Sequence, residues 1–313
     1  MKDITTIGEL LIDLTQTGIN GQKIPMMAAN PGGAPANVAV AASRLGANTA
    51  FIGKVGNDGF GNYLRQVLKE NRVDDRFLLT GDGITTMAIV TLSEDGERAF
   101  RFVRGADRML TAEEIPENLS GTKYFHFGSV SLTAEPARTA TLEAVARAKS
   151  SGAIISYDPN YREALWSGTE EAKKWMCAPL DMVDILKISE EELPLLTETN
   201  DLEFGSEMLR QRGIRLVLIT LGGKGVFCRM GEKHFTVPGI RTVVADTNGA
   251  GDTFLGAVLS QLCRRKGSLE EMSITQVKEI LAFANKAASI TCSRNGAIPA
   301  MPTFTEMKEK DYG

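Results

Sequence analysis

The stretch Asp246-Thr247-Asn248-Gly249-Ala250-Gly251-Asp252, followed by the helical pattern of 253–263, is the most informative part of this chain. The small residues Gly249, Ala250 and Gly251 let backbone N–H groups approach a ligand closely, and the helix that follows adds the positive end of its dipole. The pattern predicts an anion hole for a phosphoryl group in transfer. Asp252 lies in the first turn, where a carboxylate can take a proton from a substrate hydroxyl. Taken alone, the pattern fits equally well a carboxylate that only caps the helix.

A second glycine-rich segment lies near the start of the chain, Asn30-Pro31-Gly32-Gly33-Ala34-Pro35-Ala36-Asn37. Gly32 and Gly33 expose backbone donors, and Asn37 falls in the first turn of the predicted helix that follows. Asp13 ends the first predicted strand, and ligands gather at the carboxyl ends of the strands in open parallel sheets. A carboxylate, an amide and bare backbone suit a hydroxyl-rich substrate. A tight turn with a solvated Asn37 remains the alternative for this segment alone.

Short apolar runs alternate with amphipathic stretches between these two segments, which is typical of a layered α/β fold. One region departs from the pattern: 86–92 and 97–103 read as a β-hairpin around Ser93-Glu94-Asp95-Gly96. We expect a single domain over 1–313, a three-layer αβα sandwich with a mostly parallel sheet. A small β-sheet lid would be formed by about 14–25 and 85–104. The expected strands are 4–12, 49–55, 124–127, 153–157, 183–188 and 216–220, with a second hairpin near 225–237. The expected helices are 35–45, 60–68, 136–148, 169–177, 189–196, 203–212, 252–264 and 275–292.

The composition is that of an ordinary globular protein. The formal net charge is -4, so no basic field would recruit nucleic acid or an anionic membrane surface. The four cysteines form no C-x-x-C pair and the two histidines lie far apart, which disfavours a zinc site. No apolar run reaches the length of a membrane helix. We therefore expect a cytoplasmic protein with a small-molecule substrate, no nucleic-acid partner and no membrane partner.

Together, the motifs resemble the ribokinase-like, or PfkB, family of carbohydrate kinases, and the similarity covers essentially the whole chain. The first signature is Gly32-Gly33-Ala34-Pro35-Ala36-Asn37-Val38-Ala39, followed by Gly53-Lys54-Val55-Gly56-Asn57-Asp58-Gly59. The second is Asp246 to Asp252, continuing Thr253-Phe254. The resemblance implies a phosphotransferase with an alcohol acceptor, in which Asp252 removes the proton of a sugar hydroxyl and the amides of Gly249, Ala250 and Gly251 stabilise the transferred phosphate. It also implies that Asp13, Gly32, Gly33 and Asn37 bind the sugar, that the lid excludes water, and that the chain is a homodimer through its lid.

The same resemblance implies ATP and Mg²⁺ as cofactors. Lys187-Ile188-Ser189-Glu190-Glu191-Glu192 corresponds to the family's N-x-x-E motif, with Ser189 in place of Asn, and Glu192 would act on Mg²⁺ through water. Ser189 and Glu192 also fit a helix capping box. The remaining residues of the nucleotide site would be Lys187, Thr220, Gly222, Gly225 and Asn285. Asp246 and Asn248 mark a K⁺ site that the resemblance leaves open, because Asn248 and Ala300 depart from the ribokinase pattern.

Within the family, several segments resemble fructokinases, among them Gly8-Glu9-Leu10-Leu11-Ile12-Asp13 and Asp158-Pro159-Asn160-Tyr161-Arg162. This resemblance adds Phe102, Arg104, Asn160 and Arg162 to the sugar site and implies D-fructose phosphorylated at O6. The alternatives are a 2-keto-3-deoxygluconate kinase, whose substrate carries one more carboxylate for Arg104 or Arg162, and a catalytically silent member of the family that senses a sugar.

Overall fold

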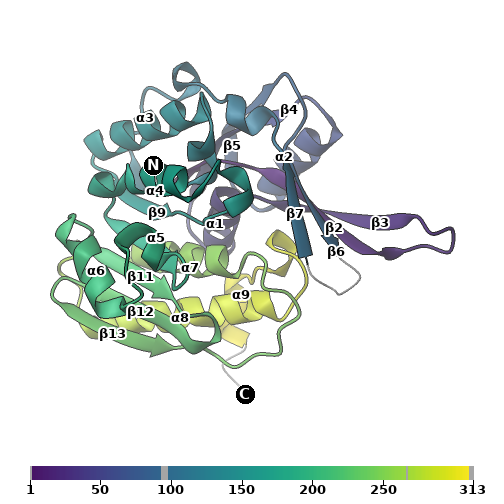
Figure 1. Ribbon diagram of the computed structural model, residues 1–313. Helices are drawn as coiled ribbons and strands as arrows, with labels where there is room; N and C mark the ends of the chain where they lie inside the picture. The colour runs from purple at the N-terminus through teal and green to yellow at the C-terminus, as the bar shows by residue number, and fades with distance from the viewer. Residues whose placement is uncertain (1, 93–97, 266, 310–313) are drawn as a thin grey trace.

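A nine-stranded sheet forms the centre of the protein in a computed structural model that describes residues 2–92, 98–265 and 267–309 (Figure 1). Its order is β13-β12-β11-β10-β9-β8-β1-β4-β5. All neighbouring strands from β11 to β5 run parallel, and β12 and β13 add an antiparallel edge. The strands are β1 (Lys2–Ile7), β4 (Thr49–Gly56), β5 (Asp74–Gly81), β8 (Thr122–Gly128), β9 (Ile154–Asp158), β10 (Ile185–Ser189), β11 (Leu216–Thr220), β12 (Gly225–Met230) and β13 (Lys233–Pro238).

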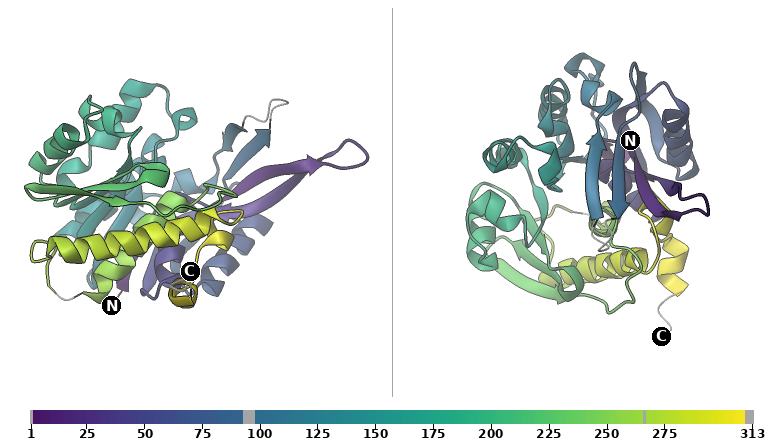
Figure 2. Two further views of the ribbon diagram at one scale, coloured as in Figure 1. Left: turned by 90° about the horizontal axis from the view of Figure 1, so that it is seen from below. Right: turned by 45° about the vertical axis from the view of Figure 1, so that its right-hand side comes forward.

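Helices cover both faces of this sheet, so the expected three-layer αβα sandwich is confirmed (Figure 2). One layer contains α1 (Ala34–Arg44), α2 (Gly59–Glu70), α7 (Ala250–Arg264) and α8 (Ile274–Cys292). The other contains α3 (Ala137–Ser150), α4 (Thr169–Cys177), α5 (Leu193–Thr197) and α6 (Leu202–Gln211), and α9 (Phe304–Glu309) ends the described chain. None of the helices within the described ranges combines the length and the apolar character needed to cross a membrane.

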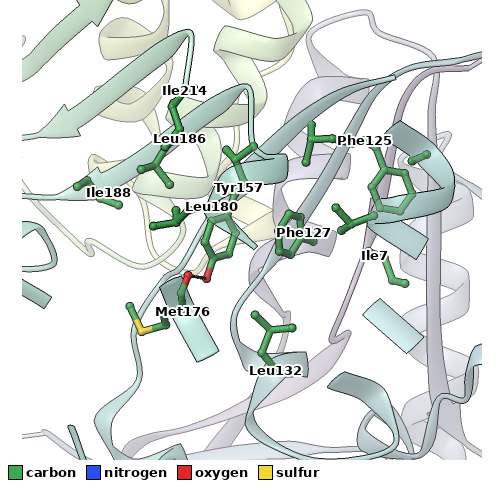
Figure 3. Close-up of a cluster of buried hydrophobic side chains, with 14 of the residues drawn as sticks. Ile7, Phe125, Phe127, Leu132, Tyr157, Met176, Leu180, Leu186, Ile188 and Ile214 are labelled. Carbon is green, nitrogen blue, oxygen red and sulfur yellow. Dashed lines mark hydrogen bonds between the residues drawn. The ribbon is translucent and has the colours of Figure 1, made fainter. Parts of the chain in front are cut away.

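Alternate residues along each strand supply the two cores, as the two-residue period of a strand requires. Leu218 of β11 packs among α7 and α8, and its neighbour Ile219 packs on the side of α3 and α4. On that second side Tyr157 stacks on Phe127 with ring centroids 4.4 Å apart. The Tyr157 hydroxyl donates to the carbonyl of Met176 at 3.2 Å, which satisfies its only polar group (Figure 3). Both faces of the sheet are therefore buried, so a ligand can reach the sheet only at its edges.

A separate four-stranded sheet, which we call the small sheet, has the order β3-β2-β6-β7. It consists of β2 (Leu11–Ile19), β3 (Pro25–Gly32), β6 (Met87–Leu92) and β7 (Arg98–Val103). The expected hairpin of 86–103 pairs as β6 and β7, and its predicted turn at 93–96 lies outside the described residues. The β2–β3 hairpin extends well beyond the body of the protein (Figure 1). The first part of the small sheet therefore spans 11–32, more than the expected 14–25.

The prediction of one strand over 4–12 is wrong. β1 ends at Ile7, and the chain leaves the large sheet through Gly8, whose φ of 150° is rarely adopted by other residues. A side chain at Gly8 would also collide with Pro35, at 2.6 Å. Asp13 accordingly lies in β2 of the small sheet and does not end the first strand of the large one.

Two helix boundaries also differ from the predictions. The helix expected over 189–196 is the single short α5, which begins at Leu193, because Ser189 ends β10 and 190–192 form a turn. The helix expected from 252 begins at Ala250, which places the second and third residues of the glycine-rich motif within its first turn.

Candidate active site

A cleft of about 490 Å³ opens between the small sheet and the carboxyl edge of the large sheet. Three segments far apart in the sequence meet there: the loop after β1, the N-terminus of α1 and the N-terminus of α7. The residues that line it are Glu9, Leu11, Asp13, Thr15, Gly33, Ala34, Asn37, Ala88, Val90, Phe102, Val130, Asn160, Arg162, Lys187, Asp246, Thr247, Asn248, Gly249, Gly251 and Asp252. Most of the predicted sugar-binding residues line this cleft, and Gly32 and Arg104 do not. Ala250 of the predicted anion hole is also not among the lining residues.

The N-terminus of α7 has the geometry that an anion hole needs. Gly249 precedes the helix with φ 73°, and a side chain there would meet Ala297 at 2.8 Å, so glycine is required. The N–H of Ala250 makes only a 3.3 Å bond to the Thr247 carbonyl. The next amides, of Gly251 and Asp252, belong to the first turn, where N–H groups have no partner within the helix. These two N–H groups can therefore donate to an anion in the cleft.

Asp252 is buried at the base of the cleft and is held by Asn37. The Asn37 side-chain amide donates to the Asp252 carboxylate at 2.8 Å, which joins α1 to α7. Burial, reinforced by the charge of Asp158, raises the pKa of Asp252 to about 6, against the hydrogen bond from Asn37 and the charges of Lys187 and Arg162. A carboxylate with this pKa is ionised at neutral pH and is a stronger base than a solvated aspartate.

Asp13 reaches the same cleft from the small sheet. Burial raises its pKa to about 6, partly offset by the hydrogen bond from Asn248, whose side-chain amide lies 3.5 Å away. A side chain at Gly32 would meet the Asp13 carboxylate at 2.4 Å, so Gly32 makes room for Asp13. Gly33 does line the cleft, with φ 109°. The predicted sugar-binding part of the cleft therefore offers both the carboxylate of Asp13 and the exposed backbone of Gly33.

Lys187 and Asp158 form a buried ion pair beneath the α7 N-terminus. The ammonium lies 2.9 Å from the Asp158 carboxylate, with side-chain exposures of 8% and 2%. Burial alone would lower the pKa of Lys187, but the charges of Asp158 and Glu192 outweigh it and raise the pKa. Asp158 did not stand out in the sequence as a site residue, because an aspartate that ends a buried strand has no signature of its own.

Both carboxylate oxygens of Glu192 accept hydrogen bonds from the protein. One oxygen accepts from the N–H of Ser189 at 2.7 Å, the other from the N–H of Tyr161 at 2.6 Å. The Ser189 hydroxyl in turn accepts from the N–H of Glu192, so both bonds of the predicted capping box are present. Among the described residues no group of three or more His, Cys, Asp or Glu is arranged to hold a metal ion. Glu192 is buried and is not among the residues that line the cleft.

The other residues predicted for the nucleotide lie outside this cleft. The Thr220 hydroxyl donates to the Ile188 carbonyl, and Gly222 and Gly225 adopt positive φ of 55° and 107° in the turn between β11 and β12. Asn285 donates to the carbonyls of Val237 and Pro238, at 3.3 and 2.9 Å. In this structure the Asn285 amide therefore ties α8 to the end of β13.

The two predicted arginines differ in what they contact. Arg104 pairs with Asp107 at 2.8 Å and donates to Thr133, so its guanidinium is used within the protein and does not line the cleft. Arg162 does line it and is exposed, and within the described part of the chain its guanidinium donates to backbone carbonyls, the shortest bond being 3.0 Å to that of Tyr161. Asn160 lines the cleft with a φ of 49°, an uncommon conformation that aims this loop at the site.

Asp246 organises the loop before the anion hole. Its carboxylate accepts from the N–H of Asn248 and from the N–H of Gly296, both at 3.1 Å. Both bonds stabilise the turn that delivers Gly249 to the cleft. Asp246 also lines the cleft.

Glu9 is a lining residue that the sequence did not single out. It is 3% exposed, and one of its oxygens accepts from the N–H of Ala34 at 2.8 Å. The other oxygen has no hydrogen-bond partner among the residues that the structure describes. Burial raises its pKa to about 7. The position between two apolar stretches gives no sign of a functional carboxylate, so only the fold reveals it.

Comparison with known proteins now decides the family. The model of the pfkB family carbohydrate kinases matches residues 1–304. The chain belongs to this family. It is 43% identical over 311 residues to fructokinase-1 of Zea mays, covering 97% of this chain and 96% of the relative. A crystal structure of a fructokinase from Xylella fastidiosa with bound ATP superposes with a TM-score of 0.90 at 31% identity, covering 99% of this chain and 98% of the other. A fructokinase double mutant from Vibrio cholerae, bound to fructose, ADP and a potassium ion, gives a TM-score of 0.88 at 32% identity with the same coverage.

Proposed function

We propose that this protein is an ATP-dependent fructokinase that phosphorylates D-fructose at O6. The observation that carries the proposal is the Asp252 carboxylate, held by Asn37 at 2.8 Å beside the free amides of the α7 N-terminus. This arrangement lies in a cleft whose other side offers Asp13 and Gly33. Full-length similarity to fructokinases of plants and bacteria supports fructose as the sugar.

The chemistry follows from this arrangement. Asp252 accepts the proton of the sugar hydroxyl as the hydroxyl oxygen forms a bond to the γ-phosphorus of ATP. ADP leaves as the bond between the γ-phosphorus and the oxygen that bridges it to the β-phosphate breaks. The amides of Gly251 and Asp252 stabilise the charge on the oxygens of the transferred group. The small sheet would act as a lid that excludes water, which would otherwise take the phosphoryl group. Residues of β2, β6 and β7 line the cleft, which supports this role.

Mg²⁺ and ATP are part of the proposal. Mg²⁺ keeps several waters and binds mainly to phosphates, so a site with few carboxylates suits it, and Glu192 would hold it through water. The ion would neutralise charge on the phosphates. The proposed surroundings of the nucleotide are Lys187, Ser189, Thr220, Gly222, Gly225 and Asn285. A K⁺ site at Asp246 and Asn248 is supported by the potassium ion bound to the Vibrio cholerae relative.

The decisive test is ADP release with a panel of fructose, ribose, 2-keto-3-deoxygluconate and nucleosides. We expect the highest kcat/KM with fructose, and we expect Asp252→Asn to reduce kcat by at least about 1,000-fold while fructose still binds. The amide keeps the shape and can still contact Asn37, but it cannot take the proton. Absence of turnover with every member of the panel would favour a sugar-sensing protein instead.

The second candidate, a 2-keto-3-deoxygluconate kinase, is favoured by one observation. Arg162 lines the cleft as an exposed cation, and its charge lowers the pKa of both Asp13 and Asp252. An arginine in this position could pair with a substrate carboxylate. A higher kcat/KM for 2-keto-3-deoxygluconate than for fructose would select this alternative.

The cytoplasmic location and the homodimer through the small sheet also stay predictions. The dimer is supported by exposed apolar side chains on the β2–β3 hairpin, where Ile19, Ile24 and Met26 are 64%, 52% and 49% exposed. Apolar side chains gathered on a projecting hairpin are typical of an interaction surface.

A further inference from the structure

The helix α1 takes the cap of its N-terminus from another part of the chain. The first N–H groups of a helix have no partner within the helix, and a Ser, Thr, Asp or Asn just before the helix usually accepts from one of them. α1 is preceded by Gly33, which has no side chain, and its first turn, 34–37, contains no acidic residue. The carboxyl group of Glu9, 25 positions earlier, accepts from the N–H of Ala34 at 2.8 Å. Glu9 therefore serves as the cap of α1.

A cap at position 33 itself is excluded by the shape of the cleft. Gly33 has a φ of 109°, and a side chain there would meet the carbonyl oxygen of Glu9 at 2.4 Å. Gly33 also lines the cleft, where its bare backbone faces the proposed sugar site. The residue before α1 must therefore be glycine, and the helix depends on a more distant acceptor.

Glu9 lies beside the sugar-binding residues and is buried there. It is 3% exposed and lines the cleft together with Gly33 and Asn37. Its charged neighbours Arg104 and Asp107 pair with each other at 2.8 Å. Burial, reinforced by the charge of Asp107, raises the pKa of Glu9 to about 7, against backbone hydrogen bonds and the charge of Arg104. Since the protonated carboxyl group also keeps an oxygen that accepts from Ala34, the cap requires an acceptor and not a negative charge.

We propose that Glu9 is a positioning residue of the sugar site, which fixes the first turn of α1 and with it the backbone of Gly33 and the side chain of Asn37. The inference rests on the proposed kinase function. The N–H of Asn37 donates to the Gly33 carbonyl at 2.8 Å, so both sugar-binding residues belong to the turn that Glu9 caps. A looser turn would have to be ordered when the sugar binds, which lowers affinity. The effect should fall chiefly on the KM for the sugar, because Asp252 and the anion hole lie on α7.

The competing explanation is that Glu9 contacts the sugar directly. Its second carboxyl oxygen has no hydrogen-bond partner among the described residues, and an oxygen of this kind can accept from a sugar hydroxyl. That oxygen is itself buried, which favours the positioning role. The two explanations differ in what happens to α1 when the acceptor is removed: a positioning residue leaves the first turn looser, and a contact residue leaves it unchanged.

The first experiment compares the steady-state kinetics of the wild type, Glu9→Met and Glu9→Gln at pH 8. We expect Glu9→Met to raise the KM for fructose about 10-fold, with kcat and the KM for ATP changed less than about 3-fold. Glu9→Gln keeps an acceptor oxygen without the charge, so its KM for fructose should stay within about 3-fold of the wild type. An unchanged KM in Glu9→Met, or a KM in Glu9→Gln as high as in Glu9→Met, would overturn the proposal. Glu9→Ala takes the place of Glu9→Met if the latter does not fold.

A second experiment measures amide hydrogen exchange over 34–40 in the absence of substrates. Exchange should be faster in Glu9→Met than in the wild type, and unchanged in Glu9→Gln. A raised KM with unchanged exchange would assign Glu9 to direct contact with the sugar. Faster exchange with an unchanged KM would show that the cap only stabilises α1. Either result would overturn the positioning role.

The same two experiments separate this inference from the proposed function. If another sugar of the panel is phosphorylated in place of fructose, the proposed substrate fails, and the KM for that sugar is compared among the variants. If no sugar is phosphorylated, the kinase function fails. The dissociation constant of fructose, measured by calorimetry, then replaces the KM and should rise about 10-fold in Glu9→Met.

The matched control is Asp201→Ala, which removes a carboxylate cap far from the cleft in the sequence. Asp201 accepts from the N–H of Phe204 at 2.9 Å at the start of α6, and it does not line the cleft. We expect this variant to lower the thermal midpoint and to leave the KM for fructose within about 2-fold of the wild type. A rise in KM as large as in Glu9→Met would show that the KM responds to any lost helix cap and would overturn the assignment.

Discussion

At the scale of single residues, the pKa of Asp252, the proposed base, should set the pH range in which the enzyme works. Burial raises this pKa to about 6, and transfer needs the carboxylate form, so kcat should fall as the pH drops through about 6. Asn37 stabilises the carboxylate through its hydrogen bond, and its removal should raise the pKa further. We therefore expect the acid limb of the kcat profile to move to higher pH in Asn37→Ala, measured with saturating fructose and ATP between pH 5 and 9.

The control for this shift is Thr15→Ala, which changes another lining residue that does not bond to Asp252. Its acid limb should coincide with that of the wild type even if its KM rises. An acid limb that stays in place in Asn37→Ala, or moves to lower pH, would contradict the role of Asn37 as the partner of the base.

At the scale of helices and strands, much of the fold follows from the sequence and some of it does not. The continuous apolar run Leu216–Thr220 predicts a strand buried on both faces, and β11 has those bounds. The break after Ile7 was not predictable, because the apolar residues continue through Ile12 and hide the departure of the chain at Gly8.

The same limit applies to side chains within motifs. Asp252 and Asn37, 215 positions apart, are both suggested by their motifs and meet at 2.8 Å. A motif does not reveal whether a polar side chain contacts a ligand or its own backbone, and Arg104 and Asn285 turn to protein partners in the structure. Packing determines whether a polar side chain contacts a ligand or another part of the protein.

Asn285 gives a prediction at the element scale, because its amide joins α8 to β13. Asn285→Ala leaves two carbonyls without their donor, which should cost about 1–3 kcal/mol of the free energy of unfolding. We expect a thermal midpoint lower by a few degrees. If its role is purely structural, the KM for ATP at 25 °C should stay within about 2-fold; a rise of 10-fold or more without loss of stability would instead place Asn285 in the nucleotide site.

At the scale of the whole molecule, the small sheet contributes residues both to the cleft and to the proposed dimer contact. Asp13 enters the cleft from β2, and the same strand ends in the exposed Ile19 of the projecting hairpin. A partner that covers this hairpin would hold β2 in place and with it the Asp13 carboxylate. Dissociation should therefore affect sugar binding as well as oligomeric state, a link that a dimer through any other surface would not produce.

We accordingly expect Ile19→Glu combined with Ile24→Glu to convert a dimer into a monomer in light scattering after size-exclusion chromatography. The KM for fructose should rise several-fold, with the KM for ATP little changed, because the anion hole lies on α7 in the body of the protein. Phe204→Glu is the matched control, since Phe204 is 61% exposed on α6 and lies outside the small sheet. A wild-type chain that elutes as a monomer at all concentrations would exclude the dimer, and a monomeric double variant with an unchanged KM for fructose would show that the small sheet binds sugar without help from a partner.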